Sequence, residues 1–159
     1  MDVSHRRLVA EHATSRVLAE STHSADALPR VLEAVCTTLG WEHGAFWEVD
    51  RPAGVLRCRD IWAVSDNRFP AFEALSRSTT FAPGVGLPGR VWATRRPAFI
   101  TDVLRDGNFP RAPVAAREGL HAAVAFPILL GGEVAGVMEF FSREIREPDA
   151  ELLAMLETI

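Results

Sequence analysis

Apolar residues near the end of the chain form two nearly continuous runs on either side of a glycine pair. The runs cover residues 120–130 and 133–142, and Gly131-Gly132 between them is a strong signal for a two-residue hairpin turn. A hairpin with one face in water would alternate apolar and polar residues, and these runs do not. We therefore expect a central antiparallel sheet that is covered on both faces by helices or loops.

Helical periodicity predicts longer helices toward the two ends of the chain. The first, 4–21, has a thin apolar stripe, whereas the second, 27–39, has a broad one on which Cys36 is expected to be a core thiol. The last, 148–159, begins at Pro148, a favourable first helical residue. Its pattern stops at Ile159 without a cap, which favours a fragment of a longer protein.

The middle of the chain predicts shorter elements. Strands at 45–50 and 55–64 flank a Pro-Ala-Gly turn, and alternation places Leu56, Cys58, Asp60 and Trp62 on one face of the second strand. Short helices are expected at 69–77, 88–94 and 113–118, and a short strand at 98–101.

Composition narrows the functional classes. The chain has 159 residues, 48% apolar and 24% charged, as expected for one globular domain. Its net charge is −4, with 17 basic and 21 acidic residues spread along the chain, which disfavours nucleic acid as a partner. All basic residues are Arg, so a Walker or Schiff-base lysine is excluded. We find no signal peptide and no apolar run near the roughly 20 residues of a membrane helix, so we expect a cytoplasmic protein.

Several segments taken together resemble a GAF domain of a bacterial multi-sensor histidine kinase or related signal-transduction protein. They are LGWEHGAFWEVD, FAPGVGLPGRVWATRRPAFITDV, NFPRA, FPILLGGEVAGVMEFF and REPDAELLAML. The resemblance covers roughly residues 6–159 and implies one GAF domain over 1–159. It implies an α+β, GAF-like (PAS-related) fold, with terminal helices on one face of the antiparallel sheet and a pocket of short helices and loops on the other.

The resemblance also implies a sensory or regulatory role upstream of an output module. A pocket ligand or a partner would bias the setting of helices 4–21 and 148–159, which we expect to pair across a homodimer. The residues expected at that interface are Leu8, Val17, Leu18, Leu152, Leu156 and Ile159. A dimerisation and spacer module without a ligand is the alternative, because the same residues can fill a core or line a cavity.

The pocket candidates are aromatic and polar residues in the segments expected around the pocket. They are Trp62, Phe72, Phe81, Arg90, Trp92, Phe109, His121, Phe126 and Glu139. Without Tyr or Lys the cavity should be mainly apolar, so an apolar or aromatic small molecule fits it better than a phosphate ester.

A glycine-rich segment formally matches the dinucleotide fingerprint. Gly84-Val85-Gly86-Leu87-Pro88-Gly89 has the G-x-G-x-x-G spacing, but no parallel βαβ unit is predicted around it. We therefore interpret the glycines as turn residues. A weaker hypothesis is that free amides at the following helix start bind an anion, aided by Arg90.

We expect no metal, no cofactor and no catalytic residue. Cyclic-nucleotide-binding GAF domains use a motif with Lys, and bilin-binding relatives use a Cys where this chain has 109–112, without Cys. Haem-binding relatives use a His, and His121 is the nearest here, but a lone His in an apolar setting is more often structural. Free-methionine sulfoxide reductases share the GAF fold and are a distant alternative, because neither Cys36 nor Cys58 has their sequence context.

Overall fold

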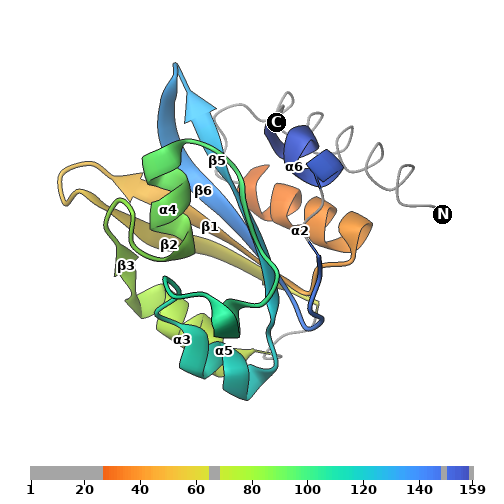
Figure 1. The fold of residues 1–159 in the computed structure, drawn as a ribbon. Helices are drawn as coiled ribbons and strands as arrows, with labels where there is room; N and C mark the ends of the chain where they lie inside the picture. Colours follow the sequence, from red (N-terminus) through yellow and green to blue (C-terminus); the bar gives the residue numbers. More distant parts are fainter. Residues whose placement is uncertain (1–26, 65–68, 148–149, 158–159) are drawn as a thin grey trace.

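The fold is built on a six-stranded antiparallel sheet (Figure 1), seen in a computed structural model that describes residues 27–64, 69–147 and 150–157. Its strand order is β3-β2-β1-β6-β5-β4. The strands are β1 (His43–Asp50), β2 (Val55–Ala63), β3 (Thr80–Phe81), β4 (Ala98–Ile100), β5 (Ala122–Leu130) and β6 (Glu133–Ser142). The sheet therefore joins the two hairpins that the sequence predicts, through the pairing of β1 with β6.

One face of the sheet is covered by α2 (Ala27–Leu39), with α6 (Ala150–Glu157) beside it (Figure 1). The apolar stripe of α2 includes Val31, Leu32, Val35 and Cys36, and all four side chains are buried against the strands. Leu153 of α6 packs on the same cluster. The predicted amphipathic face of 27–39 is therefore confirmed, and Cys36 is a core thiol.

The opposite face is covered by shorter elements, as the resemblance implied. They are α3 (Pro70–Ser78), α4 (Gly86–Thr94), the 3₁₀ turn η1 (Val103–Arg105) and α5 (Ala112–Glu118) (Figure 1). Their buried side chains include Phe72, Leu87, Val103 and Ala115. The expected α+β fold, with helices on one face and short helices and loops on the other, is therefore confirmed.

The β5–β6 hairpin is buried on both faces over most of its length. Val124 and Phe126 pack toward α2, and the neighbouring Ala123 and Ala125 pack toward the short helices. Only the tip departs from the expectation: Leu129 is 48% exposed and Leu130 is 56% exposed. The tip extends past the covering helices, so its apolar side chains meet solvent (Figure 1).

A β-bulge in β2 overturns the predicted alternation of this strand. Phe46 pairs with Asp60 whereas Trp47 pairs with Cys58, so Arg59 is an extra residue between them. Before the bulge, Leu56 and Cys58 face the short helices; after it, Trp62 packs on the α2 side. Trp62 therefore does not share a face with Leu56 and Cys58, contrary to our expectation.

The short helices lie within a few residues of their predicted positions, while β3 and η1 have only two and three residues and were not predicted. The predicted helix 4–21 and the interface residues Leu8, Val17, Leu18 and Ile159 lie outside the described residues, as do the side chains of Leu152 and Leu156. Over the described residues, none of the helices is long and apolar enough to cross a membrane.

Candidate functional site

An arginine side chain is buried between the sheet and the short helices. Arg111 immediately precedes α5 and is 1% exposed. Its guanidinium carbon lies 5.0–5.5 Å from the centroids of five aromatic rings, at Trp47, Phe72, Phe81, Phe109 and Phe141. These rings come from β1, α3, β3, the loop before α5 and β6. We call the five rings, together with Glu139, the Arg111 cage.

Glu139 supplies the opposite charge from β6. Its Oε2 accepts a hydrogen bond from Arg111 Nη2 at 2.5 Å, and its Oε1 accepts one from Trp47 Nε1 at 3.0 Å. Arg111 Nη1 donates to Ser76 Oγ at 3.0 Å, whereas Arg111 Nε has no partner among the described residues. Both charged side chains are almost completely removed from solvent, so each depends on the other for compensation.

His43 lies next to the cage and is also fully buried. Its ring contacts Phe69, Phe72 and Phe141, with centroids 5.6–5.8 Å apart. Neither ring nitrogen has a hydrogen-bond partner within the described part of the chain. Burial lowers the pKa of His43 to about 3, and the positive charges of Arg111 and Arg77 act in the same direction. His43 is therefore neutral near pH 7.

The structure brings together four of the nine predicted pocket residues. Phe72, Phe81, Phe109 and Glu139 meet in the Arg111 cage. Trp62 and Phe126 pack on the opposite face of the sheet, toward α2. The residues of this site that the sequence did not indicate are Arg111, Trp47, Phe141, Ser76 and His43. Glu139 could be found because it is a single acidic residue within an apolar run, and the same observation predicts that it has a basic partner.

The remaining candidates lie at the periphery. His121 Nδ1 pairs with Asp102 Oδ1 at 3.1 Å, and the same carboxylate oxygen accepts from the amide of Leu104 in η1. Trp92 lines a surface depression beside Arg51, Arg95, Glu133 and Val134. Arg90 borders a groove of about 510 Å³ between α4, β4 and α6, together with Thr94, Arg96, Pro97, Ala98, Ala150, Leu153 and Ala154.

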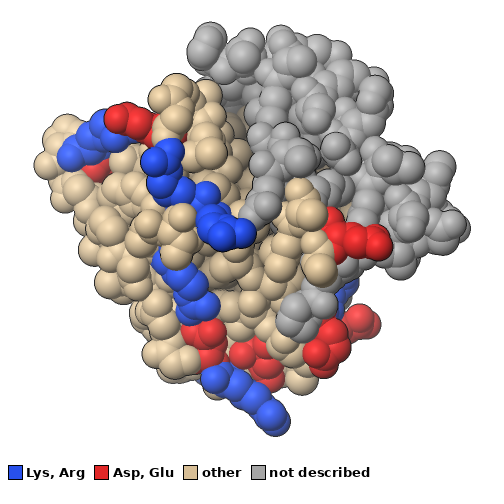
Figure 2. Space-filling view, turned by 45° about the horizontal axis from the view of Figure 1, so that its top comes forward, with Lys and Arg blue, Asp and Glu red and all other residues tan. Residues whose placement is uncertain are grey.

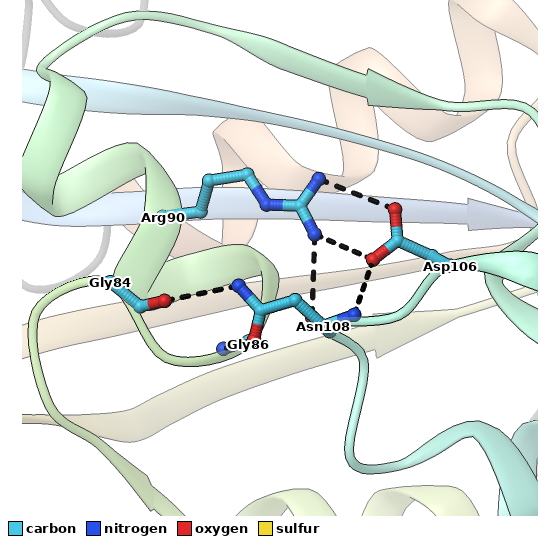
Figure 3. A network of polar contacts seen from close by, with 5 residues as sticks. All are labelled: Gly84, Gly86, Arg90, Asp106 and Asn108. Atoms are coloured by element: carbon cyan, nitrogen blue, oxygen red, sulfur yellow. Dashed lines mark hydrogen bonds and ion pairs between the residues drawn. The ribbon is translucent and has the colours of Figure 1, made fainter.

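Asn108 ties the glycine-rich turn to the loop after η1 (Figure 3). Its Nδ2 donates to the carbonyl of Gly84 at 3.0 Å, and its Oδ1 accepts from the amide of Gly86 at 2.9 Å. Gly86 is the first residue of α4. The first amide of this helix, one of those that an anion would use, is therefore already bonded.

Arg90 is held in the same network (Figure 3). Its Nη2 donates to Asp106 Oδ1 at 2.6 Å, and that oxygen also accepts from the amide of Asn108 at 2.9 Å. Burial raises the pKa of the Asp106 carboxyl, but Arg90 and the Asn108 amide lower it by more, so the net shift is downward. The geometry thus favours a structural role for Arg90 and the glycines over an anion-binding site.

Gly89 is required by close packing. A Cβ at Gly89 would lie 2.3 Å from the carbonyl oxygen of Ala82, a backbone atom that cannot move aside easily. We expect Gly89→Ala to lower the free energy of unfolding by about 1–3 kcal/mol, measured by urea denaturation. Gly107→Ala is the matched control, because a Cβ there meets nothing within 4 Å. Equal stabilities of the two variants would contradict this packing argument.

Arginine side chains form an interrupted band across one face of the molecule, with acidic side chains near both ends (Figure 2). Ion pairs neutralise part of the basic charge of the chain: Arg51 lies 3.2 Å from Glu133, and Arg90 is paired with Asp106. Charges of both signs therefore lie close together on the surface.

The two cysteines lie on opposite faces of the sheet. Cys36 packs in the α2 cluster and Cys58 against the cluster of the short helices. Burial and the charge of Glu42 raise the pKa of Cys36, and burial, aided by Glu139, raises the pKa of Cys58 to about 12. Both thiols are therefore protonated near neutral pH, the unreactive form.

Comparison with known proteins agrees with this fold. The GAF domain family profile matches residues 21–159. The HTH-type transcriptional activator RamA of Corynebacterium glutamicum is 40% identical over 73 residues, which are 45% of this chain and 25% of RamA. The chain thus matches only about a quarter of that relative's length.

Solved structures add evidence for the fold alone. The GAF domain of a phosphoenolpyruvate-protein phosphotransferase from Coxiella burnetii superposes with a TM-score of 0.74 at 17% identity, covering 96% of this chain and 88% of that one. A free methionine-R-sulfoxide reductase from Neisseria meningitidis gives a TM-score of 0.67 at 16% identity, with coverages of 96% and 88%. The family match over residues 21–159 and this shared fold lead to one conclusion: the chain belongs to the GAF domain family.

Proposed function

We propose that this GAF domain is a sensory module of a signal-transduction protein and that it binds a small molecule at the Arg111 cage. The observation that carries the proposal is the ion pair of Arg111 and Glu139, enclosed by five aromatic rings. Desolvation offsets much of the attraction in a buried ion pair, so such a pair is a weak device for stability. Buried charges with convergent aromatic groups are typical of binding sites.

The sheet connects this site to the helices on the other face. Glu139 of β6 faces the cage, and its neighbours Met138 and Phe140 pack in the α2 cluster. Phe140 stacks on Phe126 of β5, with centroids 6.0 Å apart. A ligand that moves Glu139 would therefore shift residues under α2 and bias the terminal helices, which we propose pair in a homodimer.

The parent protein that we propose is a regulator with an output module beyond this domain, in the cytoplasm. A histidine kinase is one candidate. The segment similar to RamA, a transcriptional activator, supports a transcription regulator equally well.

Native mass spectrometry and a thermal-shift screen of small molecules test the proposal. We expect a retained mass in freshly purified protein, or a compound that raises the melting temperature by about 3 °C or more. The ligand should also shift the Trp47 indole resonance, because this indole donates to Glu139. An absence of both retained mass and stabilising compounds would contradict ligand sensing and favour the spacer module.

The sulfoxide reductase alternative is less well supported. Thiol chemistry of that kind needs an accessible thiolate, whereas both cysteines here have raised pKa values and lie on opposite faces of the sheet. Thiol-dependent reduction of free methionine sulfoxide by the purified protein would instead support the reductase alternative.

A further inference from the structure

We infer that the Arg111 cage is a binding site for a guanidinium-type organic cation, and that the protein's own Arg111 occupies it until such a ligand displaces it. The inference rests on the proposed function and adds to it the chemical class of the ligand and a means of regulation.

The chemistry of the cage selects a cation. Aromatic ring faces carry partial negative charge, and five of them surround the guanidinium. The polar atoms that meet it, Glu139 Oε2 and Ser76 Oγ, both act as acceptors. The nearby indole donor of Trp47 is already bonded to Glu139 Oε1. An anion in the place of Arg111 would therefore meet the negative charge of Glu139 and the negative faces of the rings, which disfavour it.

The placement of the two acceptors favours a planar cation with a fork of N–H groups. Ser76 and Glu139 accept from the two different terminal nitrogens of Arg111, and a free guanidinium can reproduce both bonds. An alkylammonium ion has a compact charge without this geometry. We therefore expect an alkylguanidinium to bind more tightly than an alkylammonium of similar size.

Arg111 is not fully bonded in the cage, and this makes its displacement feasible. Its Nε has no partner among the described residues, although a buried N–H normally has one. His43, beside the same Phe72 and Phe141 rings, has two unpartnered ring nitrogens. A free guanidinium could donate to the acceptor nitrogen of neutral His43, a hydrogen bond that Arg111 does not make.

The position of Arg111 makes α5 a candidate lid. This seven-residue helix packs on η1 and α3, and it follows directly after Arg111. At its other end, Glu118 Oε1 accepts from the amide of Phe72 at 2.6 Å. Displacement of Arg111 would therefore release the start of α5 while Glu118 still holds its end. Binding of the cation and movement of α5 would be coupled, which is a regulatory device.

Titration with methylguanidinium chloride tests the inference in the whole chain. In Arg111→Ala, which removes the internal occupant, we expect saturable stabilisation in the low millimolar range and a shift of the Trp47 indole resonance. Arg111→Ala/Glu139→Gln, which also removes the countercharge, should bind at least about tenfold more weakly. Wild-type protein should likewise bind at least about tenfold more weakly than Arg111→Ala, because Arg111 competes.

Methylammonium, sodium chloride and urea at equal concentrations are the controls. Equal stabilisation by any of them, or a response that Glu139→Gln does not weaken, would overturn the inference. If Arg111→Ala does not fold alone, refolding yield with and without methylguanidinium replaces the titration, and an unchanged yield overturns it. A screened compound that binds wild-type protein without moving the Trp47 resonance supports sensing but overturns the cation site. Methylguanidinium binding to Arg111→Ala, with no ligand for wild-type protein, would support a cation-binding cage but would overturn the displacement of Arg111 and the proposed sensing.

Discussion

Replacing Glu139 by alanine is expected to lower the free energy of unfolding by about 3–5 kcal/mol, because it leaves the buried charge of Arg111 uncompensated. Ser76 Oγ would remain as a neutral acceptor for Arg111. Contacts with the aromatic rings would offset about 2 kcal/mol of the free-energy cost of burying the Arg111 charge. Trp47 Nε1 would also lose its acceptor. Urea denaturation at pH 7 measures the effect.

Two variants show whether burial is the cause. Glu48→Ala removes a glutamate whose partner, Arg59, is also exposed to solvent, so it should change stability by about 1 kcal/mol or less. Arg111→Met/Glu139→Leu removes both buried charges together and should recover most of the stability lost in Glu139→Ala. A loss in Glu139→Ala as small as that in Glu48→Ala would mean that the pair is hydrated in solution.

The sequence predicts half of this ion pair. Glu139 stands alone among apolar residues on a strand buried on both faces, so its need for a basic partner can be inferred. The identity of the partner cannot, because all 17 basic residues are Arg and the two members are 28 residues apart. Arg111 lies among prolines in a loop segment, where no periodic pattern marks a side chain as buried. Only the packing of α5 over the sheet brings it to Glu139.

Phe126 and Trp62 were predicted to line the pocket but pack on the opposite face of the sheet, because the sequence does not fix which face each residue of these strands occupies. A strand buried on both sides gives no signal of which residues face which layer, so the direction of Phe126 could not be predicted. For Trp62 the alternation of β2 did predict a face of the strand, but the bulge at Arg59 moves the residues after it to the other face. The order of the layers and the positions of the elements can be predicted from apolar patterns. Which residues reach the Arg111 cage depends instead on which face of its strand each side chain occupies.

Acidification is expected to destabilise the domain through His43. Burial, with the charges of Arg111 and Arg77, lowers the pKa of His43 in the folded state from 6.5 to about 3. In the unfolded chain His43 therefore binds a proton as the pH falls below about 6.5, whereas in the folded chain it stays neutral until the pH approaches 3. The contribution of neutral His43 is fully present above pH 6.5 and is lost as the pH falls toward 3, by about 2 kcal/mol at pH 5 and about 3 kcal/mol at pH 4.

His43→Leu isolates this contribution. It replaces two unpartnered ring nitrogens by apolar atoms, so at pH 7 the variant should match or exceed the wild type in stability. Between pH 7 and pH 5 most carboxylates stay ionised in both states, so the difference between the two proteins reports on His43. Urea denaturation of both at pH 7, 6 and 5 should show the wild type losing about 2 kcal/mol more than His43→Leu. Parallel losses would mean that the imidazole accepts a proton in the folded state, and hence that water or a ligand reaches the interior beside the Arg111 cage.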